Sequence, residues 1–284
     1  TRQPMTDARL EDGSRVHMII PPASVDGPVI TIRRFPQNLI RMQDLLAWKS
    51  ITGEAADFLI CLVKAGYNLF VSGGTGSGKT TFISLIPRFY DATEGEVLVD
   101  GINVKDYKFD TLYDKLGYVT QKAVLFAGSI RENVFFGESA APETDEELKN
   151  AIELSQAEEF VDKLPDGTEH MISQMGRNVS GGQKQRLSIA RALSRKPEIL
   201  VFDDSFSALD YKTDAKLREG LNEKLKETTK IIVAQRISTI RHADKIIVLD
   251  RGEAVGMGTH EELMKNCDVY KEIALSQLSA AELA

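Results

Sequence analysis

The sequence has few of the features that mark secreted, membrane-spanning or nucleic-acid-binding chains. Its two cysteines lie far apart in apolar or mixed segments, which predicts reduced core residues in a cytosolic protein. No apolar run approaches the length that crosses a bilayer, and no signal peptide opens the chain. With 35 basic and 42 acidic residues the net charge is −7, so no nucleic-acid partner is expected. Metal-ligand spacing is absent from the cysteines and histidines alike: Cys61, Cys267, His17, His170, His242 and His260.

One glycine-rich stretch carries the clearest chemistry. Gly73-Gly74-Thr75-Gly76-Ser77-Gly78-Lys79-Thr80 fits the phosphate-binding pattern G-x-x-x-x-G-K-[ST]. The glycines allow consecutive N–H groups to point at an anion, Lys79 offers an ammonium to the β- and γ-phosphates, and the Thr80 hydroxyl is a magnesium ligand. An apolar run at 67–71 predicts the strand entering the loop, and Thr81–Ile86 predicts the helix leaving it. This context favours a nucleotide site over a chance glycine-rich turn.

The segment before this loop predicts a small domain of its own. Short strand-like runs occur at Val16–Ile20 and Val29–Ile32, and amphipathic helices are expected at 43–49 and 54–65. Through about residue 72 the segment resembles the N-terminal part of type II/IV secretion and pilus-assembly ATPases: Met5–Leu10, Asp12–Val16, Ile20-Pro21-Pro22 and Thr31–Phe35. The resemblance implies that Arg33 or Arg34 lies near the nucleotide, although solvated charges flanking a strand explain them equally well.

From the glycine-rich loop to about Gln277 the resemblance is to another family, the nucleotide-binding domains of ABC exporters. Its motifs include Pro87–Asp91, Glu94–Val97, Val99–Gly101, Leu116–Gln121 and Ser129–Asn133. The resemblance implies that Gln121 is the Q-loop glutamine, whose amide touches magnesium and senses the γ-phosphate. The two families share the sequence Thr-Gly-Ser-Gly-Lys-Thr-Thr, so the chain looks like a splice made at this loop.

A second motif separates ABC domains from other P-loop folds. In Val179-Ser180-Gly181-Gly182-Gln183, the serine and glutamine have the spacing of a capping box at a helix start. An ordinary capped helix would explain Ser180 and Gln183 but not both glycines, which expose backbone N–H groups beside the positive end of the helix. The resemblance implies that Ser180, Gly181, Gly182 and Gln183 close over ATP held by a partner subunit.

A continuous apolar run at 198–202 predicts a strand buried on both faces of a parallel sheet, and it ends in two carboxylates. Carboxylates at such a strand end lie beside the P-loop in open α/β sheets. The resemblance makes Asp203 the Walker B residue that holds magnesium through water, and Ser207–Asp210 the D-loop. Lys230–Ala234 and Lys245–Leu249 predict two further strands, and Thr259 opens a terminal helix.

The sequence departs from the exporter pattern at three places. The catalytic glutamate is replaced by Asp204, one methylene shorter, and a misplacement of about 1 Å can cost about a hundredfold in rate. The switch histidine is replaced by Gln235, whose amide carries no charge to stabilise a transferring phosphoryl group. Both changes resemble the degenerate-site half of heterodimeric exporters. No aromatic before the loop matches the residue that stacks on adenine, the nearest being Phe35, Trp48, Phe58 and Tyr67.

Together these features predict an α/β fold: a parallel P-loop sheet flanked by helices, a helical arm with the signature, and a small N-terminal α+β domain at 1–50 before the P-loop domain at 51–284. The first interpretation is an ATP-binding subunit of an ABC-type transporter that binds Mg-ATP, dimerises with a second nucleotide-binding domain, hydrolyses ATP slowly and lies in the cytoplasm against a transmembrane partner. Alternatives are a ring-forming secretion motor, disfavoured because its histidine and aspartate boxes are absent after the loop, and a non-catalytic nucleotide-binding chimera.

Overall fold

The structure is a computed structural model, and it describes residues 5–9, 15–19, 29–33, 69–72, 78–92, 95–234 and 236–277. The chain divides into two compact units, Thr1–Arg41 and Met42–Ala284. The helices expected at 43–49 and 54–65, the cysteine Cys61 and the four aromatics considered for adenine stacking all lie outside the described residues. The domain boundary at residue 50 therefore stays a prediction.

The first unit contains a three-stranded antiparallel sheet. Its strands are β1 (Met5–Arg9), β2 (Arg15–Ile19) and β3 (Val29–Arg33), in the order β1-β2-β3. Val16 on the central strand pairs with Ala8 on one side and Ile32 on the other. The strands expected at 16–20 and 29–32 are therefore present, each shifted or extended by a single residue.

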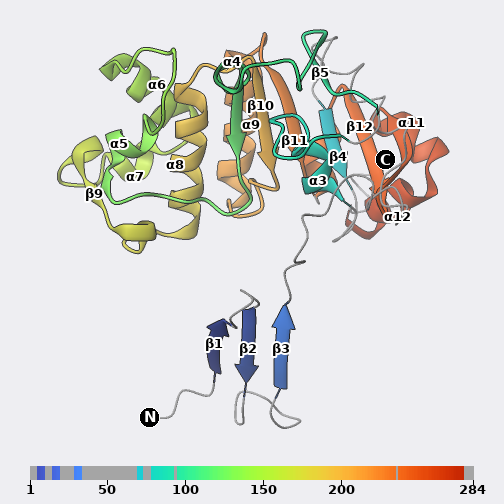
Figure 1. The fold of residues 1–284 in the computed structure, drawn as a ribbon, viewed down its shortest axis with the longest axis horizontal. Coiled ribbons are helices and arrows are strands. Elements are labelled where there is room, and N and C mark those ends of the chain that lie inside the picture. Colours follow the sequence, from blue (N-terminus) through green and yellow to red (C-terminus); the bar gives the residue numbers. More distant parts are fainter. Residues whose placement is uncertain are drawn as a thin grey trace. The chain divides into compact units, whose positions relative to one another are not determined.

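The second unit is built on a six-stranded sheet in the order β13-β12-β4-β11-β10-β7 (Figure 1). All neighbours are parallel except β12 and β13, which pair antiparallel at one edge. The strand β4 that enters the glycine-rich loop lies inside the sheet, between β11 and β12. The strands are β4 (Leu69–Ser72), β7 (Leu116–Val119), β10 (Ile199–Asp203), β11 (Thr229–Val233), β12 (Lys245–Asp250) and β13 (Glu253–Gly258).

The central strands are apolar on both faces because each face packs on a separate core. Side chains of a strand alternate between the two faces of a sheet. On β10, Ile199 and Val201 join one cluster, whereas Leu200 and Phe202 join the other. The strands β11 and β12 divide their side chains in the same way. The unbroken apolar runs that predicted these strands thus reflect burial on both sides.

Different helices cover the two faces. One core takes α3 (Lys79–Ile83), α4 (Phe109–Lys115) and the hairpin of β5 (Leu98–Val99) and β6 (Ile102–Asn103). The other takes the signature helix α8 (Gly181–Ser194) and the helices that follow it, with an arm of short helices at one end of the sheet (Figure 1). The remaining helices are α5 (Ile130–Val134), α6 (Asp145–Leu154), α7 (Glu158–Val161), α9 (Tyr211–Lys224), α10 (Ile237–Ile240), α11 (His260–Asn266) and α12 (Asp268–Gln277). Two short strands, β8 (Gly128–Ser129) and β9 (Met171–Ile172), pair within the arm, which also holds 3₁₀ turns at Gly167–Glu169 and Gln174–Gly176.

The helix after the glycine-rich loop is shorter than the sequence predicts. The sequence predicts it over 81–86, but it begins at Lys79 and ends at Ile83. The Ser84 hydroxyl donates to the Thr80 carbonyl at 2.6 Å, and the next N–H groups bond three residues back, Leu85 to Phe82 and Ile86 to Ile83. Pro87 has no N–H to donate and disfavours a helical residue before it. The chain therefore leaves α3 in a series of tight turns.

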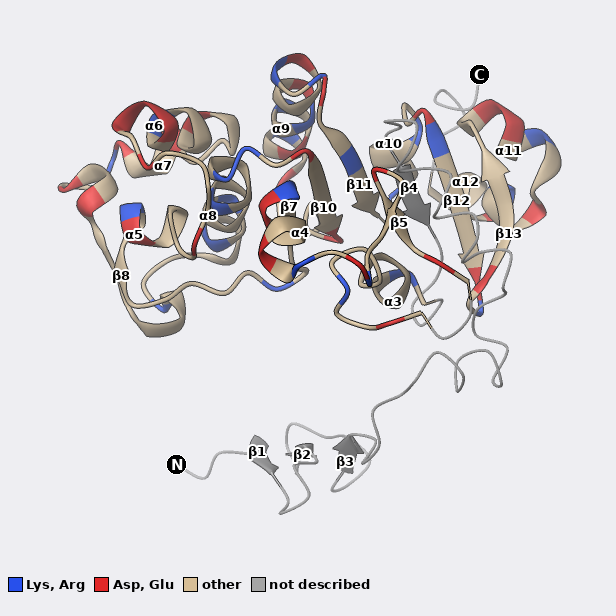
Figure 2. Ribbon diagram, turned by 45° about the horizontal axis from the view of Figure 1, so that its top comes forward, with Lys and Arg blue, Asp and Glu red and all other residues tan. Residues whose placement is uncertain are grey.

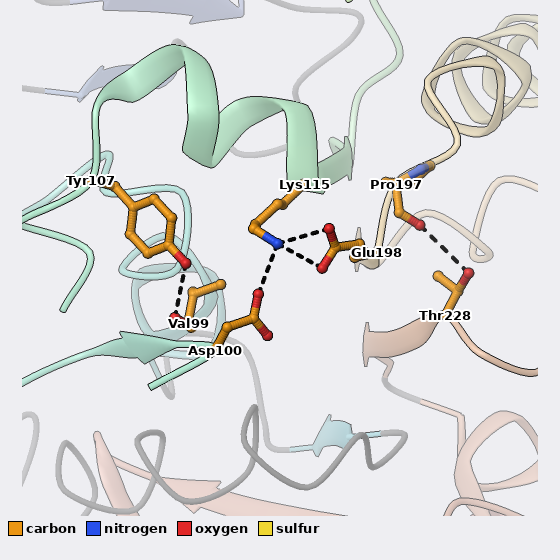
Figure 3. Close-up of polar contacts among 7 residues, drawn as sticks. All are labelled: Val99, Asp100, Tyr107, Lys115, Pro197, Glu198 and Thr228. Atoms are coloured by element: carbon orange, nitrogen blue, oxygen red, sulfur yellow. Dashed lines mark hydrogen bonds and ion pairs between the residues drawn. The ribbon is translucent and has the colours of Figure 1, made fainter. Parts of the chain in front are cut away.

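The start of β10 is tied to the neighbouring hairpin by charge (Figure 3). Lys115, the last residue of α4, lies 2.7 Å from Glu198 and 2.9 Å from Asp100. These contacts raise the pKa of Lys115, chiefly through its hydrogen bonds to the two carboxylates. Both carboxylates are partly exposed, so each pair contributes modestly to stability. The bridge connects the end of α4 to the residue before β10 and to the turn that follows β5.

Charges of both signs are interspersed on α9 and α11, whereas the charged residues of α8 are all lysine or arginine (Figure 2). In the part of the chain that the structure describes, none of the helices combines the length and the apolar composition of a membrane span.

Candidate nucleotide site

The predicted site residues follow three of the parallel strands, β4, β10 and β7. Gly78, Lys79 and Thr80 come after β4, Gln121 after β7, and Asp203 and Asp204 at the end of β10. Parallel strands direct their carboxyl ends to one edge of the sheet, which is where ligands bind in open α/β folds. The predicted loop residues Gly73, Gly74, Thr75, Gly76 and Ser77, and the switch residue Gln235, lie outside the described residues.

The described end of the loop has the geometry that its glycine predicts. Gly78 precedes α3 with a φ of 89°, a left-handed conformation that favours glycine. Lys79 follows it and is buried, with 9% of its surface exposed. Burial lowers the pKa of the Lys79 ammonium, and the carboxylates of Asp204 and Asp203 oppose that shift. An anion added here would meet a cation that water solvates poorly, and this favours phosphate binding.

The Thr80 hydroxyl reaches the Walker B carboxylate across the sheet. Its Oγ1 donates to Asp203 Oδ1 at 3.0 Å, although 123 residues separate them. Burial raises the pKa of Asp203, while the Thr80 hydrogen bond and the Lys79 charge oppose the rise. Hydroxyl and carboxylate oxygens are the donors that magnesium prefers, and magnesium beside nucleotides uses few protein ligands together with phosphates and water. The donor pair therefore fits the predicted magnesium ion, and phosphate oxygens and water would complete its coordination.

Asp204 is held in an unusual conformation next to this pair. Its φ is 47°, and 8% of its surface is exposed. The Asp204 N–H donates to the Val233 carbonyl at 3.1 Å, and the Ser207 hydroxyl donates to the Asp204 carbonyl at 2.7 Å. The Gln121 amide Nε2 donates to Asp204 Oδ2 at 3.1 Å. The two side chains predicted to act on the γ-phosphate thus contact each other, and the amide oxygen of Gln121 is the atom that suits a metal.

The signature segment folds as its spacing predicts. The Ser180 N–H donates to Gln183 Oε1 at 2.8 Å, and the Gln183 N–H donates to Ser180 Oγ at 3.3 Å. This capping box begins α8 and is confirmed. A Cβ added at Gly181 would meet nothing within 4 Å, whereas one at Gly182 would lie 3.4 Å from the Ala208 carbonyl oxygen of the predicted D-loop. One face of the signature is therefore open, and the other lies against the D-loop.

Further residues, outside the motifs found in the sequence, connect α8 to the site. Gln185, 2% exposed, donates through Nε2 to the Thr120 carbonyl at 3.2 Å, one residue before Gln121. The buried Ser205 hydroxyl donates to the Val119 carbonyl at 2.9 Å. These bonds tie the signature helix and the segment after Asp204 to the end of β7. The sequence shows only a glutamine two positions beyond the signature, and its burial is evident from the structure alone.

Arg191 connects α8 to the segment that follows Gln121. Its guanidinium donates to the carbonyls of Asn133 at 2.7 Å and Val124 at 2.9 Å, and to Asn133 Oδ1 at 3.0 Å. It also lies over the stacked rings of Phe126 and Phe136, whose centroids are 4.0 Å apart. Burial lowers the pKa of Arg191 to about 10. Hydrogen-bonded carbonyls and aromatic faces thus stabilise this charge.

Comparison with known families decides the identity of the fold. The family model described as "ABC transporter" matches residues 60–207, just over half of the chain. The chain belongs to the ABC transporter family. Its fold is that of the ATP-binding domain of these transporters, a family of ATPases, as the sequence motifs predicted.

Individual relatives agree with the ABC assignment. An uncharacterized ABC transporter ATP-binding protein of Mycobacterium tuberculosis is 45% identical over 256 residues, which are 87% of this chain and 43% of that protein. ABC transporter B family member 21 of Arabidopsis thaliana is 43% identical over 216 residues, 76% of this chain and 16% of the plant protein. The structure of a bacterial Atm1-family ABC exporter with ATP bound matches with a TM-score of 0.71 and 35% identity, covering 75% of this chain and 37% of that one. The chain thus spans less than half the length of these relatives.

A second family model, described as "Type II/IV secretion system protein", matches residues 1–99. The two matches overlap over residues 60–99, which include the glycine-rich loop. The resemblance to two families, noted from the sequence, is therefore confirmed.

Proposed function

We propose that this chain binds Mg-ATP as the nucleotide-binding half of an ABC exporter. The observation that carries the proposal is the 3.0 Å bond from Thr80 to Asp203, because it joins the two predicted magnesium ligands beside the buried Lys79. The predicted loop residues 73–77 and Thr81 would complete the phosphate cradle. Phosphate oxygens would neutralise Lys79, and magnesium would neutralise Asp203.

We further propose that hydrolysis at this chain's own site is slow. The buried Asp204 carboxylate accepts a hydrogen bond from Gln121, and its backbone is held by Val233 and Ser207. A side chain one methylene shorter than glutamate, fixed in this way, is poorly placed to orient water for in-line attack on the γ-phosphate. Gln235 would add no positive charge to the transition state.

The intact signature supports a role in a dimer. The capping box fixes Ser180 at the start of α8, and the space next to Gly181 is open. A second nucleotide-binding domain, identical or different, would present its γ-phosphate to this open face. The signature of this chain would then complete the partner's site, whatever the rate at its own.

A transmembrane partner is the last part of the proposal. Val124, Phe126 and Phe136 are 55%, 41% and 49% exposed. Val124 and Phe126 belong to the segment that follows Gln121, and Arg191 contacts all three residues. One relative, from Staphylococcus aureus, carries a name that describes a multidrug export ATP-binding/permease protein. A permease docked on these apolar side chains would place the chain at the cytoplasmic face of the membrane and connect transport to Gln121.

The decisive test is calorimetric titration of Mg-ATP into wild type and Lys79→Ala. Removing the buried cation that offsets phosphate charge is expected to abolish measurable binding. Lys163→Ala is the matched control, because this lysine is exposed and pairs with the exposed Glu159. Equal affinity of Lys79→Ala and wild type would remove the basis of the nucleotide site.

A second candidate, a secretion-type motor, is favoured by the family match at residues 1–99. Such motors form rings, whereas the ABC proposal requires dimers. Light scattering of the chain with Mg-ATP separates them: a dimer supports the first proposal, and a larger closed ring supports the second.

A further inference from the structure

The short helix α10 lies directly after the switch position, and its own sequence leaves its first turn uncapped. Its N-cap residue, Arg236, makes no side-chain cap hydrogen bond. The first N–H groups of a helix have no partner inside the helix and need an acceptor elsewhere. For Ile237, that acceptor is Gln277 Oε1 at 2.9 Å, contributed by the last residue of α12, forty positions along the chain.

Gln277 also borders the same cavity as the residue that follows Walker B. The cavity has a volume of about 330 Å³. Its lining includes Asp204, Ser207, Val233, Arg236, Thr239 and Gln277. Val233 ends β11 and accepts the hydrogen bond from the Asp204 N–H at 3.1 Å. Only three residues separate Val233 from Ile237. The Gln277 amide oxygen therefore accepts from Ile237, and Val233, a few residues earlier in the chain, accepts from the Asp204 N–H.

The helix that carries Gln277 is firmly anchored. On α12, Tyr270 and Ala274 are fully buried, and the Tyr270 hydroxyl lies 2.8 Å from His260 Nδ1 on α11. The helix packs on both α10 and β12. Gln277 is exposed at the end of this helix, and the packing of α12 positions its amide next to α10.

We infer that Gln277 is a positioning residue for the nucleotide site: its amide oxygen caps α10 and thereby positions Arg236, Ala234 and the Asp204 backbone. The α12 helix becomes a structural support of the site, so a displacement of this helix would change the geometry around the γ-phosphate. The inference deepens the proposed function and rests on it for its catalytic consequence, while the hydrogen-bond arrangement itself is independent of nucleotide.

The test begins without nucleotide, by measuring hydrogen exchange of individual backbone amides. Gln277→Leu removes the acceptor oxygen and keeps a side chain of similar size. Gln277→Asn has a side chain one methylene shorter, so its acceptor oxygen lies farther from Ile237. Gln277→Glu retains an acceptor oxygen at the same position. Glu272→Leu is the control, an exposed polar side chain on the same helix. We expect Leu and Asn to accelerate exchange at Ile237 by about fivefold, as for a lost helix cap, and to accelerate exchange at Asp204 as well. Glu should restore both amides, and the β10 core amide of Leu200 should stay unchanged.

Single-turnover hydrolysis of Mg-ATP by excess protein then tests the catalytic consequence. Gln277→Leu should lower the hydrolysis rate constant severalfold while the Kd for ATP stays within about twofold of wild type, and Gln277→Glu should recover the rate. If exchange at Ile237 accelerates but neither exchange at Asp204 nor the hydrolysis rate constant changes, the hydrogen bond from Ile237 to Gln277 is only a local helix cap. That result would overturn the inference. Unchanged exchange at Ile237 would also overturn it. Failure of wild type to bind ATP would instead refute the proposed function and leave the exchange results standing.

Discussion

Replacing Thr80 by valine tests the geometry of the site most sharply. The change removes one hydroxyl and keeps the β-branched shape. In wild type, that hydroxyl donates to Asp203 Oδ1 at 3.0 Å, and Asp203 is only 6% exposed. Hydrogen bonds to charged groups contribute about 1.5–3 kcal/mol. Because Thr80 itself is exposed, we expect the lower end, a loss of about 1.5 kcal/mol in the free energy of unfolding at neutral pH.

The pH dependence of this loss has a definite sign. The hydrogen bond favours the ionised carboxylate and opposes the burial that raises the pKa of Asp203. The contribution of Thr80 is therefore present above the pKa of Asp203 and is lost as the pH falls through it. That pKa lies above the ordinary aspartate value because burial dominates. Valine raises it further, so the two proteins should converge in stability in acid.

The assay is urea unfolding of wild type and Thr80→Val between neutral and acidic pH, followed by ATP titration with and without magnesium. Valine should also remove most of the gain in ATP affinity that magnesium provides, by about tenfold or more, since a predicted metal ligand is gone. Thr111→Val, on the exposed side of α4, is the control. If both variants lose equal stability and keep equal magnesium dependence, the Thr80–Asp203 pair is not a metal site.

Three further predictions follow from other parts of the structure. Arg191→Met should cost about 2–4 kcal/mol in urea unfolding, because it removes the donor to the carbonyl and side-chain oxygens of the buried Asn133; a change below about 0.5 kcal/mol would contradict this. Ser180→Ala should lower stability by about 1 kcal/mol through loss of the capping box and leave ATP affinity unchanged; weaker ATP binding would mean that Ser180 serves this chain's own site. Without a matched adenine-stacking aromatic, ATP and GTP should compete within a few-fold, and a preference above about a hundredfold, 2.7 kcal/mol, would show that one of the aromatics before the loop reads the base.

Local patterns in the sequence were sufficient for much of the second unit. The strands β10, β11 and β12 are apolar over their whole length because both sheet faces are buried, and that property is visible in the residues themselves. The capping box at Ser180 depends on residues only three positions apart, so spacing alone identified the start of α8; the structure adds a second capping box at Thr259, where α11 begins.

The contacts that organise the site were harder to predict. Gln121 with Asp204, Gln185 with Thr120 and Arg191 with Asn133 join residues 58 to 83 positions apart, and their geometry depends on how strands and helices pack. The early end of α3 resulted from Ser84 competing for the backbone before Pro87, a local effect that the helical pattern concealed. The roles of the predicted site residues remain proposals that follow from this geometry.

The most direct test of the central claim, that this chain is a degenerate half-site with an intact signature, is ATPase rate against protein concentration. It compares wild type, the Asp204→Glu/Gln235→His double variant and Ser180→Arg. We predict negligible steady-state turnover for wild type. The double variant should recover turnover that rises with concentration as dimers form, and adding Ser180→Arg to it should abolish that turnover while ATP binding persists. Brisk hydrolysis by wild type that is independent of concentration would contradict the account.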